Sequence, residues 1–303
     1  MGKLAERQLR LQQQISTGQR ITTASDDPKA MRRVLDLRSE RSLLTQYQDN
    51  IATLRENANV VYSTVSAMKR LSDRASEISV LADGTKAPSA LSAYAMEVDQ
   101  LLEETLRLSN TQHRDVYIFS GTKSKTAAYT ATRAVDEKIT AVSFDGNSNS
   151  NKIDIAPSTS MDGNYSAEGA QGVLKNSAND ADFITNLIAL RDNLTTAADT
   201  TLTRDANKAA LTIIKDTVVG NLDKDEVNFI DHFSGIGATL SRLETSEAIT
   251  KSQVASIEPL VSNEVDADLA DSLVRLNEIQ NAYTAALQSG GLLMKTSLLD
   301  YIR

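Results

Sequence analysis

The chain has 303 residues, a formal net charge of −8 at pH 7, 4% aromatic residues, and neither cysteine nor tryptophan. An acidic chain without a basic run is a poor partner for nucleic acid or an anionic membrane, so we expect neither as a partner. The lack of cysteine excludes disulfides, thiolate metal sites and cysteine nucleophiles, and no stretch approaches the roughly 18 apolar residues of a membrane span.

The first predicted element is a short amphipathic helix that ends at Gly18, because glycine takes the left-handed C-cap conformation without steric cost. A second helix is predicted to begin at Asp27-Pro28, since aspartate caps free amides and proline fits the first helical position. Asp26 would add negative charge at the same helix end. Residues 19–25 are free to run extended between the helices as a joint. The joint residues are Gly18, Arg20, Ile21, Asp26, Asp27 and Pro28.

The second helix is predicted to run from Lys29 to Ala82, a stretch without glycine or proline. It carries two apolar rows with seven-residue spacing, offset by three, which is typical of a coiled-coil seam. A helix of roughly 50 residues is about 75 Å long and must pack on a partner helix. The seam residues of this helix are Leu37, Leu44, Ile51, Leu54, Val61, Val65 and Met68.

The character of the sequence changes in the middle of the chain. A turn at residues 83–88 leads into a helix predicted from Pro88 to about Thr111, and a β-prone run follows at 116–119. The stretch VSFDGNSNSNKIDI predicts two strands, 141–144 and 152–155, paired around a polar turn. We therefore expect a small β-rich insert.

Helix is predicted again from Asp180, which with Asp182 is expected to cap it, and a further piece from Arg204 is expected to break or kink at residues 220–223. A long helix from about Asp225 should then bury one face, formed by Ile230, Phe233, Ile236, Leu240 and Leu243. The last helix repeats the heptad spacing of the N-terminal seam. Its seam residues are Leu269, Leu273, Leu276, Tyr283 and Leu287.

These elements predict a mainly α fold: an elongated coiled-coil-like bundle of long N- and C-terminal helices with a small β-rich inserted domain. Because each apolar stripe needs a partner, the terminal segments should be neighbours in space. The expected parts are a terminal assembly helix, a discontinuous helical rod domain, a β-rich variable insert and a C-terminal assembly segment. They correspond to residues 1–18, 19–122 with 180–289, 123–179, and 290–303.

No pattern of catalytic residues stands out. His113 and His232 lie in no motif that orients them, and the acidic clusters fall where helices begin, which suits capping better than metal binding. No glycine-rich phosphate loop is present. We expect a protein that is not an enzyme, with no catalytic residues, cofactor or metal.

Two terminal motifs are similar to those of a known family. ISTGQRITTASDDPKAM at residues 15–31 resembles the N-terminal signature of the bacterial flagellin superfamily, and LADSLVRLNEIQNAYTAALQSGGLLMKTSLLDYI at 269–302 resembles its C-terminal helix. RDVYIFSGTKSKTAAY at 114–129 and GIGATLSRLE at 235–244 are similar to elements of the hook-associated junction proteins of that superfamily. Family members usually carry further residues before the first heptad, so residues 1–18 are expected to be a truncated assembly helix.

The resemblance implies a structural adaptor between the hook and the filament of the bacterial flagellum, assembled by coiled-coil packing of its terminal helices. It implies an extracellular location after export by the flagellar type III apparatus, without a cleaved signal peptide. The implied partners are neighbouring copies in a ring, the first hook-associated protein on the hook side, flagellin on the filament side, and an export chaperone. Two alternatives are flagellin itself, the bulk filament subunit, and a surface-binding flagellin homologue whose insert contacts a host or carbohydrate ligand.

Overall fold

The computed structural model describes the backbone of residues 2–301 and the side chains of residues 2–292. It divides into two compact units, one formed by residues 1–46 with 249–303 and the other by residues 47–248. Part of the expected C-terminal assembly segment therefore lies outside the described residues, namely residues 302–303 and the side chains from 293 onward.

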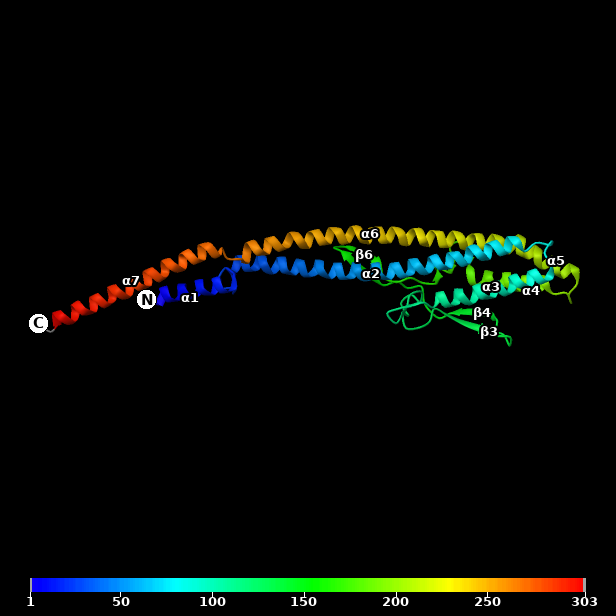
Figure 1. The fold of residues 1–303 in the computed structure, drawn as a ribbon. Coiled ribbons are helices and arrows are strands. Elements are labelled where there is room, and N and C mark those ends of the chain that lie inside the picture. The colour runs from blue at the N-terminus through cyan, green and yellow to red at the C-terminus, as the bar shows by residue number, and fades with distance from the viewer. Residues whose placement is uncertain (1, 302–303) are drawn as a thin grey trace. The chain divides into compact units, whose positions relative to one another are not determined.

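The described part of the first unit consists of helices and the connectors between them. The helices are α1 (Gly2–Thr17), the beginning of α2 (Pro28–Leu81), the end of α6 (Val219–Val265), and α7 (Leu269–Tyr301). α1 and α7 lie side by side and antiparallel (Figure 1). The segments of α2 and α6 are joined by an Arg33–Glu264 ion pair at 2.8 Å and an Arg41–Glu258 pair at 3.5 Å. The predicted proximity of the N- and C-terminal segments is confirmed in this unit.

In the second unit, the longer parts of α2 and α6 pack with three further helices. These are α3 (Pro88–Ser109), α4 (Phe183–Ala198) and α5 (Arg204–Ile213). Both predicted rows of α2 are buried here, and α6 contributes a matching buried row with seven-residue spacing. The α6 row is Leu222, Phe229, Ile236 and Leu243. Phe229 also meets Phe183 of α4 edge to face, with ring centroids 5.1 Å apart.

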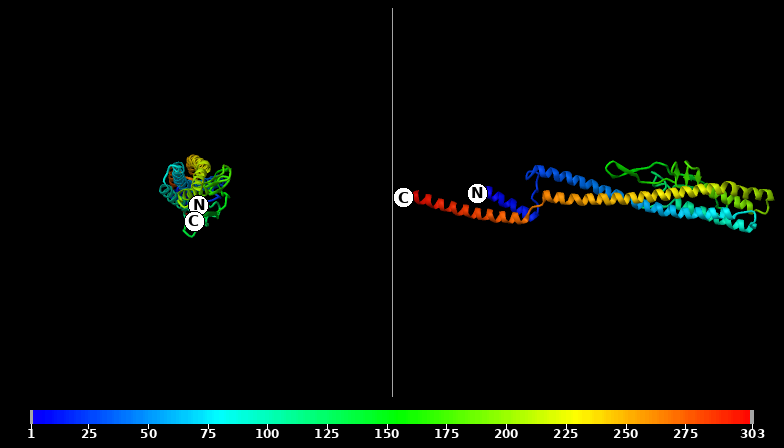
Figure 2. Two further views of the ribbon diagram at one scale, coloured as in Figure 1. Left: turned by 90° about the vertical axis from the view of Figure 1, so that its right-hand side faces the viewer. Right: turned by 90° about the horizontal axis from the view of Figure 1, so that it is seen from above.

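The β-rich part lies between α3 and α4 in the sequence. Its strands are β1 (Gln112–His113), β2 (Val116–Tyr117), β3 (Tyr129–Arg133), β4 (Ile139–Phe144), β5 (Lys152–Ala156), β6 (Thr159–Asp162), β7 (Glu168–Gly169), β8 (Lys175–Asn176) and β9 (Ala181–Asp182). The first six form three antiparallel hairpins, and β8 lies between β7 and β9 in a small mixed sheet. The strands lie on one side of α2 and α6 (Figure 2). The predicted fold class is confirmed.

The predicted pairing of strands 141–144 and 152–155 is wrong, although both segments are strands. They belong to β4 and β5, which pair with β3 and β6 instead. The residues between them are not a hairpin turn, because Asn147 is bound to the loop after β2. Its N–H donates to Ser120 O at 3.1 Å, and its side-chain oxygen accepts from Thr122 N–H at 2.9 Å.

Three details of the C-terminal half also differ from the prediction. The irregular turn is a π-helix at Ile214–Val218 rather than a break at 220–223. Its wider turn keeps both Ile214 and Val218 in the core. Ile230 is 42% exposed, because Phe229 is the residue in phase with the buried row of α6. The cap of α4 is Asp182 alone, whose carboxylate accepts from Thr185 N–H at 3.3 Å, whereas Asp180 has a left-handed φ of 57°. Among the described residues, no helix is long and apolar enough to cross a membrane.

Candidate assembly site

The predicted joint pairs with a second connector, the segment between α6 and α7. α1 ends at Gly18, whose φ of 68° is the left-handed conformation expected there. Arg20 N–H donates to Val265 O at 2.6 Å, and Ala267 N–H donates to Gly18 O at 2.9 Å. Residues 19–25 are therefore not free: the first part of the joint forms an antiparallel bridge with the chain's own second connector.

Charged side chains reinforce this bridge. Arg20 donates to the carbonyl of Glu264 at 2.8 Å, and its guanidinium lies 3.5 Å from the Asp27 carboxylate. Arg33 binds the Glu264 carboxylate through two hydrogen bonds of 2.8 Å, which lower the pKa of Glu264. Ile21 is buried beside them at 4% exposure. The joint is a locked connection in which Glu264 binds two arginines, Arg33 through its carboxylate and Arg20 through its backbone carbonyl.

Arg33 and Glu264 belong to no motif singled out from the sequence. A signal for them existed, because Glu264 follows Ile257 by seven residues and so continues the buried row of α6. A carboxylate at such a position needs an ionic or hydrogen-bonding partner when it packs on another helix. The row therefore predicts a basic residue on the facing helix.

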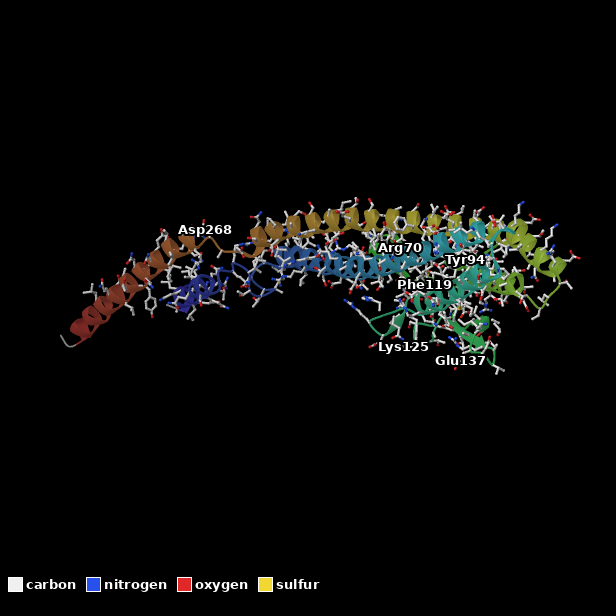
Figure 3. The ribbon with its side chains drawn as sticks, turned by 45° about the vertical axis from the view of Figure 1, so that its right-hand side comes forward. Arg70, Tyr94, Phe119, Lys125, Glu137 and Asp268 are labelled. Atoms are coloured by element: carbon white, nitrogen blue, oxygen red, sulfur yellow. The ribbon has the colours of Figure 1, made fainter. Side chains whose placement is uncertain are left out.

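Asp26 and Asp27 of the joint have different roles. Asp27 caps α2 as predicted, by accepting from Ala30 N–H at 3.0 Å, and Pro28 follows as the first helical residue. Asp26 does not cap α2. Its carboxylate instead accepts from the N–H groups of Thr23 and Thr22, which lowers the pKa of Asp26 to about 2 and folds the joint back on itself. Asp268 caps α7 from the other connector (Figure 3).

The two predicted seams are in different environments. From Leu44 to Met68, the seam residues of α2 are at most 6% exposed, and Leu37 is half-buried. On α7, Leu276 and Tyr283 are half-buried, but the other three seam residues are open to solvent. Leu269, Leu273 and Leu287 are 47%, 48% and 49% exposed. The α2 seam is packed within the chain, whereas α7 retains an exposed apolar face that suits contact with other chains.

A buried polar cluster ties the β-rich part to α6. Asn228 donates to the carbonyls of Val173 and Gly172 at 2.9 and 3.1 Å, and His232 Nε2 lies 3.1 Å from Gly172 O. One turn earlier, Asp225 is 1% exposed and accepts from Asn186 of α4 at 2.7 Å. Burial raises the pKa of Asp225 to about 7, despite that hydrogen bond.

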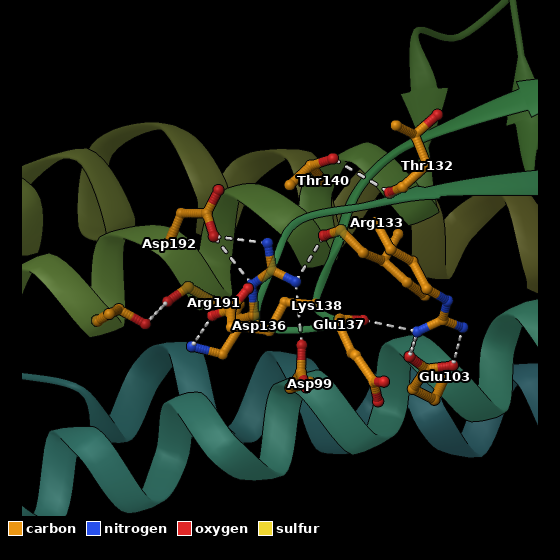
Figure 4. A network of polar contacts seen from close by, with 12 residues as sticks. Asp99, Glu103, Thr132, Arg133, Asp136, Glu137, Lys138, Thr140, Arg191 and Asp192 are labelled. Carbon is orange, nitrogen blue, oxygen red and sulfur yellow. Dashed lines mark hydrogen bonds and ion pairs between the residues drawn. The ribbon is translucent and has the colours of Figure 1, made fainter.

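A second anchor holds the β3–β4 hairpin on the helices (Figure 4). Arg191 of α4, with 5% of its side chain exposed, donates to Asp99 of α3 at 3.0 Å and to the carbonyl of Ile139 in β4 at 2.7 Å. Arg133 of β3 pairs with Glu103 of α3. Because Arg191 is buried and charged, its hydrogen bonds hold the hairpin more strongly than neutral bonds would, whereas the exposed Arg133–Glu103 pair contributes little.

Neither histidine lies in a cleft with catalytic partners. His113 Nε2 is 3.1 Å from the carboxylate of Glu56, and His232 bonds to a backbone carbonyl. Neither histidine lines the cleft beneath Met161 and Gly163 or the one between Arg55 and Glu244. Within the same part of the chain, no group of three or more metal-ligating side chains occurs.

The N-terminal resemblance is confirmed by comparison with known families. Residues 3–124 match the bacterial flagellin N-terminal helical region, so this part of the chain is similar to that region of flagellins. No curated protein matches the chain in sequence.

Solved structures share the fold. A structure from Vibrio parahaemolyticus assigned as a flagellar hook-associated protein has a TM-score of 0.65 and 21% identity, and covers 80% of this chain and 100% of its own. Flagellar hook-associated protein-3 from Legionella pneumophila has a TM-score of 0.63 and 14% identity, over 75% and 97%. FlgL from Xanthomonas campestris has a TM-score of 0.61 and 13% identity, over 73% and 98%. The chain has the fold of these hook-associated proteins.

Proposed function

We propose that this protein is a structural component of the bacterial flagellum that joins the hook to the filament. The observation that carries this proposal is the combination of a flagellin N-terminal region with a fold that spans nearly the whole length of hook-associated structures. One such structure, from Legionella pneumophila, is a flagellar junction protein. In this role the chain is an adaptor without catalytic chemistry.

The terminal helices supply the assembly surface in this proposal. Residues 1–18 and 290–303 are the assembly segments, and the exposed apolar residues of α7 pack on neighbouring copies. The locked joint connects the terminal helices to the start of α2 and the end of α6. Arg20 of the joint and Arg33 of α2 both bind Glu264 of α6, so the joint transmits the position of the terminal helices to α2 and α6. The remaining parts are a helical rod, residues 19–122 with 180–289, and a variable β-rich insert, residues 123–179.

The proposed partners are neighbouring copies in a ring, the first hook-associated protein, flagellin and an export chaperone. The proposed location is outside the cell, after export by the flagellar type III apparatus. Flagellin is the second candidate, because the matched N-terminal region is that of flagellins. The hook-associated fold neighbours favour the junction role over it.

Deletion of the gene in the bacterium that encodes the chain separates these roles. A junction protein is needed for filament attachment, so the deletion should leave hooks in place, abolish motility, and release flagellin into the medium. Re-expression of the full chain should restore filaments. Filaments of normal length on the deletion strain would refute the junction role. A deletion strain that has hooks but makes no flagellin, either in filaments or in the medium, would indicate that the chain is the bulk filament protein.

A further inference from the structure

The paired helices α2 and α6 of the second unit pack against the β5–β6 hairpin at the level of Leu54 and Leu243. Where Leu54 and Leu243 meet, the β5–β6 hairpin packs against them through Ile155, which is fully buried, and through Ile153 and Met161. The other side of the same helices is an open groove of about 470 Å³. It is lined by Arg55, Asn59, Gly237, Leu240, Ser241 and Glu244.

The α6 wall of this groove has an unusual composition for an exposed helix face. Ser241 of the groove belongs to a row at seven-residue spacing along the same helix face, Val227, Ser234, Ser241 and Ala248, all exposed and uncharged. A Cβ added at Gly237 would meet no atom within 4 Å, so the chain itself gives no packing reason for a glycine there. Glycine inside a helix is less favourable than alanine, because it loses more conformational freedom on folding. A second helix or strand laid in the groove would supply the missing reason, because a small residue allows close approach.

Charge indicates what occupies the groove. Glu244 lies in the groove wall, whereas Arg242 does not line the groove and follows Thr239 by about one helical turn; Thr239 lines the cleft beneath Met161 and Gly163 of the hairpin. Two residues along an α-helix are about 200° apart, so these side chains point to opposite sides. Both residues are exposed, and within the described part of the chain neither makes an ion pair. One segment of this protein therefore carries a free acid on its groove side and a free base on the other.

We propose that the groove docks the hairpin side of a second copy of this chain, with Glu244 of one copy facing Arg242 of the next. Because the contact joins two different faces of the same segment, it is heterologous. Such a contact closes into a ring or continues as a helix rather than stopping at a dimer. The inference rests on the proposed junction function, which requires such a ring, and it adds a second contact to that of the terminal helices. An interface of this kind also fixes the rotation of each copy about the α2–α6 pair.

Cysteine cross-linking tests the contact directly, because the chain has no native cysteine. The double variant Glu244→Cys with Arg242→Cys, expressed in the deletion strain, should give a ladder of multimers when isolated flagella are treated with a mild oxidant. The two positions within one chain face apart and cannot bond to each other. Each single variant should remain monomeric, and a dimer from Glu244→Cys alone would overturn the heterologous arrangement. A cross-link to another protein would show that the groove has a different occupant.

Charge reversal provides a second test. Glu244→Arg and Arg242→Glu should each lower the amount of the chain retained on isolated hooks about tenfold, since each places like charges together. The double swap should restore it to nearly the wild-type level. Lys208→Glu, an exposed reversal on α5, is the matched control and should have no effect. All variants should keep the wild-type circular dichroism spectrum, because the changed side chains are exposed.

The outcomes distinguish this inference from the proposed function. Suppose that the wild-type chain is found on the hooks, but the double cysteine variant gives no ladder and both single charge reversals are retained normally. This result would overturn only the groove contact. Absence of the wild-type chain from the hooks would overturn the junction role itself.

Discussion

The buried carboxyl group of Asp225 should make the second unit more stable in mild acid than at neutral pH. Burial raises the pKa of Asp225 from 3.8 to about 7. When the pH rises from 4 to 7, the unfolded chain releases this proton but the folded chain retains it, so the free energy of unfolding falls throughout that window. The stabilisation is complete below about pH 4 and lost above about pH 7.

The size of the effect follows from the pKa difference. A difference of about three pKa units corresponds to about 4 kcal/mol, at 1.36 kcal/mol per unit. Asp225→Asn removes the ionisable group but keeps its size, and the variant should be more stable than wild type by several kcal/mol at pH 8 and nearly equal to it at pH 4.5. Because the side chain is 1% exposed, solvent screening reduces this value little.

Chemical denaturation, followed by circular dichroism at pH 4.5, 6 and 8, measures this difference. Asp49→Asn, on the exposed face of α2, is the control and should follow wild type at every pH. If Asp225→Asn and wild type lost stability in parallel between pH 4.5 and 8, the carboxyl group would not be protonated in the fold, and the reasoning would be refuted.

Four further changes test other parts of the structure. Leu54→Asp places a charge among Ile155 and Leu243 and should cost several kcal/mol, seen as a large drop in melting temperature; an unchanged melting curve would mean that the seam is not packed. Arg191→Ala leaves Asp99 and the Ile139 carbonyl unpaired and should cost about 3–5 kcal/mol, whereas the exposed Arg107→Ala should cost under 1 kcal/mol. Glu264→Gln should loosen the joint, so that proteolysis near residue 20 becomes faster while the melting of the second unit stays constant. Leu273→Asp, on the exposed face of α7, should leave the melting temperature unchanged and abolish filament attachment; normal motility would argue against α7 as an assembly surface.

Regular helical patterns were readable from the sequence because their period is local. The rows through Leu54 and Met68 predicted both the length of α2 and its buried face, and Gly18 and Asp27 marked two helix ends correctly. Ile230 shows the limit of this reasoning: it and Phe229 are adjacent apolar residues, and only the phase of the facing helix decides which one is buried.

Long-range partners were not readable in the same way. β4 and β5 pair with β3 and β6 rather than with each other, and Asn147 between them binds a loop 25 residues away in sequence. Hairpin patterns carry no record of such a contact. The joint likewise depends on Val265 and Glu264, more than 200 residues from Gly18. The candidate assembly residues were predicted individually, but their arrangement follows from contacts between distant segments.

The position of the protein on the flagellum tests the central claim most directly. Gold-labelled antibody against the chain, viewed by electron microscopy on intact flagella, should mark a single site where the hook meets the filament. Label distributed along the whole filament would contradict the junction role and identify the chain as a filament subunit.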